Sequence, residues 1–193
     1  TKLTLLCIQC NQVSDLSPLS RMTNLTSLSL DDNQISDISP LSGLTNLTWL
    51  TLGKNQISDI SPLSGLTNLK TLDLRYNQIS DIRHLSGLTN LIHLRLGNNQ
   101  ISDISSLSGM TNMSSMLELN DNQISDISPL SSMINKTQIN ADKQHISVSA
   151  DAAVIPNPLK AIDGAVVPIT ADINAKNKDD DKIELLNYDS MTE

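Results

Sequence analysis

Hydrophobic residues return at a fixed interval along most of the chain. Leu50 and Leu52 are two positions apart, so they point to the same face of a short strand, and Leu47, Ile57 and Ile60 complete one apolar set around them. The same set recurs every 22 residues, with polar residues in the positions between. Because one such unit cannot bury its apolar face alone, we expect successive units to stack into a solenoid with a continuous core.

Each repeat ends on an asparagine. Six copies of LxxLxLxxN are spaced by 22 residues, except that one residue is inserted near Met116 before the last copy, and they end at Asn11, Asn33, Asn55, Asn77, Asn99 and Asn122. A buried amide needs hydrogen-bond partners, so these residues predict a structural ladder that bonds the backbone of the turn leaving each strand. An Asn-lined ligand site is the alternative. The strands themselves are expected to form a parallel sheet on the concave side, about 4.8 Å apart.

The segment SDISPLSGL predicts the return path of each coil. Asp37 precedes Ile38-Ser39-Pro40 as an N-cap followed by Pro in the first turn of a short helix, and Gly43 ends it. A repeat of 22 residues leaves room only for a short 3₁₀ turn on the convex side. Capping explains the row of carboxylates without metal, a calcium ladder being the alternative; the row is Asp15, Asp37, Asp59, Asp81, Asp103 and Asp126.

The repeat pattern fades after Leu130, so we divide the chain into a solenoid of six repeats, residues 1–132, and a second region, residues 133–193. The second region has short apolar runs separated by turn signals such as Pro156-Asn157-Pro158 and Asp163-Gly164. This alternation predicts short strands of an incomplete β-sandwich that caps the end of the solenoid.

Composition and charge narrow the function. Aromatic residues make up 2% of the chain and Phe is absent, so Leu and Ile must fill the core. The net charge of −8 disfavours binding to nucleic acid. The sequence lacks the run of about 18 apolar residues that membrane insertion requires, and it shows no signal peptide. We interpret Cys7 and Cys10 as two unpaired thiols, because zinc needs about four ligands and no second Cys pair follows.

The concave face offers candidate binding residues. The repeat phase points Trp49 and Tyr76 outward, and His93 shares the column of Trp49 two strands away. Trp, Tyr and Arg are enriched in binding hot spots, and a mixed-charge rim around an aromatic centre suits a protein partner. The alternative is unselected variation at solvent-facing sites. The expected rim consists of Lys54, Lys70, Asp73, Arg75, Arg95 and Glu118.

The unit NQISDISPLSGLTNLTxLxL resembles the leucine-rich repeats of the internalins, surface and secreted proteins of Listeria, and the stretch from Asn135 to Ile173 is similar to the Ig-like region that follows their repeats. The resemblance implies a right-handed leucine-rich-repeat solenoid followed by a partial Ig-like region. Internalins begin with a secretory signal and a helical cap, their Ig-like region runs further, and no LPxTG anchor is visible here. We therefore expect a fragment or a truncated relative.

The resemblance also implies a function. It predicts a monomeric adhesion or virulence module, secreted or on the cell surface, that engages an extracellular host protein through the concave face. An intracellular scaffold that regulates a partner enzyme such as a phosphatase is the alternative. An enzyme is not expected, because no G-x-S-x-G, P-loop or HExxH motif is present. No cofactor or metal is expected either.

Overall fold

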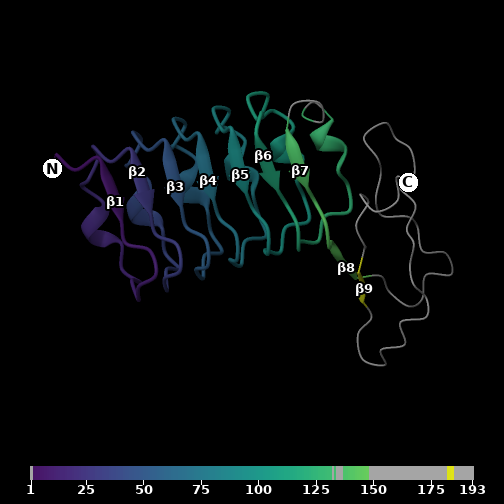
Figure 1. Ribbon diagram of the computed structural model, residues 1–193, viewed down its shortest axis with the longest axis horizontal. Coiled ribbons are helices and arrows are strands. Elements are labelled where there is room, and N and C mark those ends of the chain that lie inside the picture. Colours follow the sequence, from purple (N-terminus) through teal and green to yellow (C-terminus); the bar gives the residue numbers. More distant parts are fainter. Residues whose placement is uncertain (1, 132, 134–136, 148–181, 185–193) are drawn as a thin grey trace.

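The computed structural model describes residues 2–131, 133, 137–147 and 182–184 (Figure 1). In these residues seven short strands form one parallel sheet in chain order. The strands are β1 (Leu5–Cys7), β2 (Ser27–Ser29), β3 (Trp49–Thr51), β4 (Thr71–Asp73), β5 (His93–Arg95), β6 (Met116–Glu118) and β7 (Gln138–Asn140). The repeat that contains strand βn is called coil n below.

Each of the first six coils returns through a three-residue 3₁₀ turn, as the sequence predicted. These turns are η1 (Ser17–Leu19), η2 (Ser39–Leu41), η3 (Ser61–Leu63), η4 (Arg83–Leu85), η5 (Ser105–Leu107) and η6 (Ser128–Leu130). The turn survives where His84 and Ser106 replace the usual Pro. Ser106 there adds a bond between coils, because its Oγ donates to the Ile82 carbonyl at 3.0 Å.

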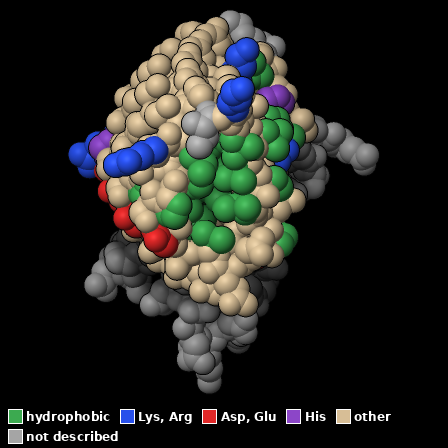
Figure 2. Space-filling view, turned by 90° about the vertical axis from the view of Figure 1, so that its left-hand side faces the viewer, with side chains coloured by type: hydrophobic (Ala, Val, Ile, Leu, Met, Phe, Trp, Pro, Cys, Tyr) green, Lys and Arg blue, Asp and Glu red, His purple; other side chains and the backbone are tan. Residues whose placement is uncertain are grey.

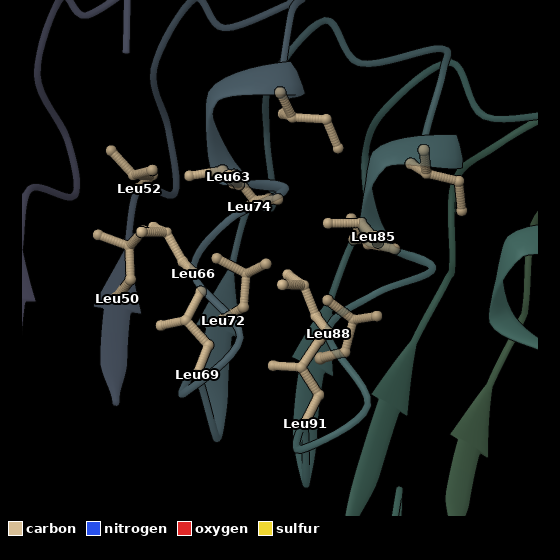
Figure 3. Packing of buried hydrophobic residues seen from close by; sticks show 14 of the residues in the cluster. Leu50, Leu52, Leu63, Leu66, Leu69, Leu72, Leu74, Leu85, Leu88 and Leu91 are labelled. Atoms are coloured by element: carbon tan, nitrogen blue, oxygen red, sulfur yellow. The ribbon is translucent and has the colours of Figure 1, made fainter. Parts of the chain in front are cut away.

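The core is a stack of leucine and isoleucine side chains between the sheet and the turns (Figure 3). Leu50 of β3 pairs in register with Leu72 of β4, and Leu72 with Leu94 of β5. All three side chains are fully buried. Met110 and Met113 take two leucine positions in coil 6, where the inserted residue falls between Met113 and Met116. The register of the sheet is therefore kept across the insertion.

The first coil leaves part of this core uncovered. Leu3 and Leu5 are 41% and 61% exposed, and Leu6, Ile8 and Val13 are only partly buried. Figure 2 shows hydrophobic side chains gathered on this end of the solenoid. The stacking that buries coils 2–6 on two sides buries this one on a single side.

The sheet continues past residue 130, where the repeat pattern fades. β7 pairs with β6 in parallel register, and Ile139 packs against the core beside the buried Thr137. A short antiparallel pair follows, formed by β8 (His145–Ser147) and β9 (Lys182–Glu184). β7 therefore belongs to the solenoid sheet, although residues 133–193 were predicted to be Ig-like, and most of the other residues of that predicted region lie outside the described residues.

Candidate functional site

The asparagines that end each repeat join successive coils. Asn55 Nδ2 donates to the carbonyls of Leu30, Leu52 and Gly53, and its Oδ1 accepts the Ile35 N–H at 3.0 Å. Asn33, Asn77, Asn99 and Asn122 repeat this arrangement. Asn11 is exposed and donates only within its own coil, to Ile8 and Gln9. From Asn33 to Asn122 the amides thus act as backbone connectors, with both ends of each side chain occupied.

The seventh rung of this ladder is a glutamine that the sequence pattern did not reveal. Gln144 is 2% exposed, its Oε1 accepts the Ile124 N–H at 2.9 Å, and its Nε2 donates to the Leu119 carbonyl at 3.0 Å. The longer side chain makes the bonds of the asparagine from the same repeat position, 22 residues after Asn122. A period search for Asn misses it because the residue type differs.

A second ladder runs through the Asn of each LTNL segment. The repeat pattern alone did not indicate it. Asn46 Nδ2 donates to the Thr23 carbonyl of the preceding coil at 2.8 Å. The same bond recurs at Asn68, Asn90 and Asn112. These side chains are exposed, so they stabilise the edge of the solenoid and not its interior.

The aspartates of the return path organise the 3₁₀ turns. Ile38 occupies the N-cap position of η2, and Asp37 accepts the Ser39 N–H from one residue earlier, at 2.8 Å. The same backbone hydrogen bond is the main cause that lowers the pKa of Asp59, and a bond from the Ser61 hydroxyl adds to it. The pKa of Asp15, Asp81 and Asp103 is lowered in the same way. Each carboxylate therefore has a structural partner, and no cluster of metal-binding side chains occurs among the described residues.

The outer face of the sheet carries two columns of side chains that alternate with the buried leucines. This outer face is the predicted concave face. The first column runs through Leu5, Ser27, Trp49, Thr71, His93, Met116 and Gln138, and the second runs through Cys7, Ser29, Thr51, Asp73, Arg95, Glu118 and Asn140. Trp49 and His93 therefore lie two strands apart in one column, with Thr71 between them.

Four of the six charged residues predicted as a rim form one connected network in the middle of this face. Arg75 contacts Asp73 at 2.7 Å and Glu118 at 3.6 Å, and Arg95 contacts the same two carboxylates at 3.5 and 3.6 Å. Asp73 is buried, at 5% exposure. The hydrogen bond from Arg75 to Asp73 raises the pKa of the guanidinium. Two cations and two carboxylates thus neutralise one another across β4, β5 and β6.

Two glycines make room for polar side chains that lie across this face. The Gly53 N–H donates to Asp31 Oδ1 at 2.8 Å, and Thr51 Oγ1 donates to the other carboxylate oxygen of Asp31. A Cβ at position 97 would meet Asn120 Oδ1 at 2.5 Å. The sequence placed both glycines on this face but gave no reason for their size.

A left-handed backbone conformation occurs once in every coil, directly after the outer-face residues. Lys54 and Tyr76 have φ values of 53° and 56°. The other residues with this conformation are Cys10, Asp32, Asn98, Asp121 and Lys143. Side chains other than Gly adopt this conformation only at a cost of about 1–2 kcal/mol, so the position is fixed by the stacking of the coils. The repeat spacing alone did not indicate it.

The two exposed aromatic residues lie at opposite edges of the outer face, with the ionic network between them. Trp49 is 47% exposed and opens β3, whereas Tyr76 is 50% exposed and follows β4. Five positions of the repeat separate them, roughly 15 Å at about 3.3 Å per residue. The arrangement is the reverse of an aromatic centre with a charged rim.

A lysine accompanies each aromatic residue on the neighbouring coil. The Lys70 N–H donates to the Thr48 carbonyl at 2.9 Å, which places Lys70 beside the start of β3 and Trp49. Lys54 and Tyr76 hold equivalent positions in coils 3 and 4, and the Asn55 N–H donates to the Tyr76 carbonyl at 3.2 Å. Both lysines are exposed. Neither forms an ion pair with another described residue. Cys7 and Cys10 are exposed free thiols. They belong to coil 1, whereas the two aromatic–lysine pairs belong to coils 3 and 4.

Comparison with known proteins identifies the family to which this solenoid belongs. The family model described as leucine-rich repeats (2 copies) matches residues 1–43, 45–88 and 89–132. An internalin C2 from Listeria monocytogenes is 37% identical, with 71% of this chain and 73% of that chain covered and a TM-score of 0.55. No curated protein sequence matches the chain significantly.

Two further solved structures share the fold. A second internalin from Listeria monocytogenes (inlF) is 34% identical over 77% of this chain, with a TM-score of 0.60, and the chain spans only 50% of its length. A leucine-rich-repeat protein of Leptospira interrogans is 25% identical over 63% of this chain and 34% of its own, with a TM-score of 0.57. Within the described residues, no helical segment has the length and hydrophobicity needed to cross a bilayer.

Proposed function

Because the chain belongs to the leucine-rich-repeat proteins and, among them, to the internalins, we propose that it binds a host protein through the outer face of its sheet. The binding residues are Trp49, Tyr76 and His93 together with Lys54 and Lys70. Arg75, Arg95, Asp73 and Glu118 support this surface from within the ionic network. The matched family model is a repeat family.

The observation that carries the proposal is the exposure of two large aromatic side chains on a rigid sheet. Trp49 and Tyr76 are about half exposed, although the leucines beside them in the sheet are fully buried. Aromatic side chains held on a fixed scaffold bind with little loss of conformational entropy, and Trp and Tyr are enriched among hot-spot residues. A broad, shallow sheet suits a protein surface better than a small molecule, which prefers a deep pocket.

The family also supports a proposal for the cellular location and biological role of the protein. We propose that the protein acts as a monomer, secreted or displayed on the bacterial surface, in adhesion or virulence. An Ig-like region after β7 belongs to this proposal. A signal sequence encoded upstream of Thr1 would favour this setting over an intracellular scaffold that regulates an enzyme.

A capture experiment tests the proposal. The immobilised protein is incubated with host-cell membrane extracts, and the bound proteins are compared with those held by the Trp49→Ala/Tyr76→Ala/His93→Ala variant. We expect the triple variant to lose at least about 100-fold in affinity for the specific partner, because hot-spot residues contribute about 2 kcal/mol or more each. Far-UV circular dichroism confirms that the variant is folded.

The matched control changes three exposed residues outside the outer face, as Gln56→Ala/Gln78→Ala/Arg83→Ala. This control variant should capture the partner as well as the parent does. Equal capture by the parent and the Trp49→Ala/Tyr76→Ala/His93→Ala variant would show that the partner binds elsewhere on the solenoid.

A further inference from the structure

Positive charge is concentrated on the outer face of coils 3–5. Residues 2–131 contain seven Lys and Arg residues, of which only Lys2, Arg21 and Arg83 lie elsewhere. The outer face of these three coils holds the other four, against a single carboxylate, Asp73. The chain as a whole carries a net charge of −8. Lysine and arginine therefore outnumber carboxylates on the outer face of coils 3–5, whereas the chain as a whole is acidic.

Two of these four cations are already neutralised within the ionic network. Arg75 and Arg95 each contact both Asp73 and Glu118 at distances of 2.7 to 3.6 Å. Two positive and two negative charges therefore balance within the network, and Asp73 is too deeply buried to accept a further partner. Lys54 and Lys70 remain as exposed cations without an ion pair among the described residues.

The two lysines are also the residues that accompany the exposed aromatics. Lys70 lies beside Trp49 at the edge where the strands begin, and Lys54 lies beside Tyr76 at the edge where they end. Each edge of coils 3 and 4 thus offers one apolar surface and one unpaired positive charge. The neutral network between the edges offers no net charge to a ligand.

We propose that these two aromatic–lysine pairs form a two-point docking site for a protein segment that presents an apolar side chain beside a carboxylate at each point. The inference rests on the proposed function and specifies its partner, whose contact surface is acidic. The two contact points are roughly 15 Å apart, which an extended segment spans in about five residues at 3.3 Å each. A basic partner would be repelled by Lys54 and Lys70, because neither lysine is paired with a carboxylate that could bind the partner instead.

Defined peptides test this site directly. The first has two Leu residues five positions apart, each next to a Glu, and the second has Lys in place of Glu. Trp49 is the only tryptophan in the chain, so its fluorescence reports occupancy at one of the two points. We expect the acidic peptide to shift the Trp49 emission in a saturable titration and to bind at least about tenfold more tightly than the basic peptide. Raising the salt concentration should weaken it, because exposed charges are screened.

Two double variants of equal net charge separate local from global electrostatics. Lys54→Gln/Lys70→Gln should weaken binding of the acidic peptide about tenfold, since each exposed pair contributes modestly. Arg21→Gln/Arg83→Gln removes two exposed cations from other parts of the solenoid and should leave binding unchanged. Both variants keep Trp49, so the readout is the same.

Several results would overturn the proposal. They are tighter binding of the basic peptide, no saturable binding of the acidic one, equal losses in the two double variants, or preference for a sulfated polysaccharide over the acidic peptide. None of these results changes the capture experiment with the Trp49→Ala/Tyr76→Ala/His93→Ala variant. If that variant still loses the host protein, the outer face remains the binding surface and only the chemistry of the partner is wrong.

Discussion

Replacement of Asn55 by Ala tests whether the asparagine ladder holds the coils together. The side chain donates to the carbonyls of Leu30, Leu52 and Gly53 and accepts the N–H of Ile35 in the preceding coil. Ala removes all four hydrogen bonds and leaves space where the amide was. The consequences for the four backbone groups differ, because some of them have a second partner.

The three carbonyls keep another donor after the substitution. Leu30 O still accepts from Asn33 Nδ2, Leu52 O from Asn77 Nδ2, and Gly53 O from the Asp32 N–H. No second acceptor is recorded for the buried Ile35 N–H. An unsatisfied buried donor costs about 1–3 kcal/mol, and the three carbonyls, which each keep another donor, together add roughly 1 kcal/mol. We therefore expect Asn55→Ala to lower the free energy of unfolding by about 2–4 kcal/mol.

Asn11→Ala is the matched control, because Asn11 occupies the same repeat position but is exposed. Its Nδ2 donates to Ile8 and Gln9 of its own coil, and Ile8 O also accepts from Asn33. No N–H from another coil depends on it. We expect a loss below about 1 kcal/mol.

Urea unfolding followed by circular dichroism measures both variants at one pH. The m-value shows whether the whole array still unfolds together, as repeat proteins do when neighbouring coils are coupled. For a chain of this size the Asn55→Ala loss corresponds to a fall in melting temperature of roughly 4–16 °C. A loss for Asn55→Ala that is no larger than the loss for Asn11→Ala would refute the ladder as a connection between coils.

Two further predictions concern the outer face and the turns. Gly97→Ala should lower the free energy of unfolding measured in urea by about 1–3 kcal/mol, because the new Cβ meets Asn120. Gly109→Ala is the control and should not destabilise the protein, because a Cβ there meets nothing within 4 Å. Equal effects of the two substitutions would contradict the clash. Folding lowers the pKa of Asp15, Asp59, Asp81 and Asp103, so their contribution is complete above the unfolded value of about 3.9 and is lost as pH falls through the lowered folded values. The urea concentration at the unfolding midpoint should therefore decrease as the pH is lowered below about 4, and it should decrease less steeply in Asp59→Asn. A midpoint that does not change with pH would contradict this prediction.

The repeating elements of the fold could be predicted from the sequence because each depends on neighbours that are themselves repeats. The inward leucines such as Leu50 and Leu72, the asparagine ladder and the 3₁₀ turns follow from the spacing alone, since every coil meets a near copy of itself. The same reasoning placed Trp49 and Tyr76 on the outer face, where both are exposed.

The prediction failed where an element is not repeated. Gln144 replaces the ladder asparagine with a different residue type at the same 22-residue spacing. β7 follows a segment in which the leucine pattern is already lost. A pattern search requires identity of residue type, whereas the structure requires only that an amide at that position reaches the Ile124 N–H and the Leu119 carbonyl.

By itself, then, the sequence determined the period of the solenoid, the side of each strand that is buried and the residues that face outward. Only the tertiary structure decided which outward residues meet. It joined Asp73 to Glu118 through two arginines, set Lys54 and Tyr76 in left-handed backbone, and left Lys54 and Lys70 unpaired beside the aromatics. The physical reason is that the strand period fixes the direction of a side chain, but contacts between coils depend on the stacking distance, on side-chain length and on the space that residues such as Gly53 and Gly97 leave open.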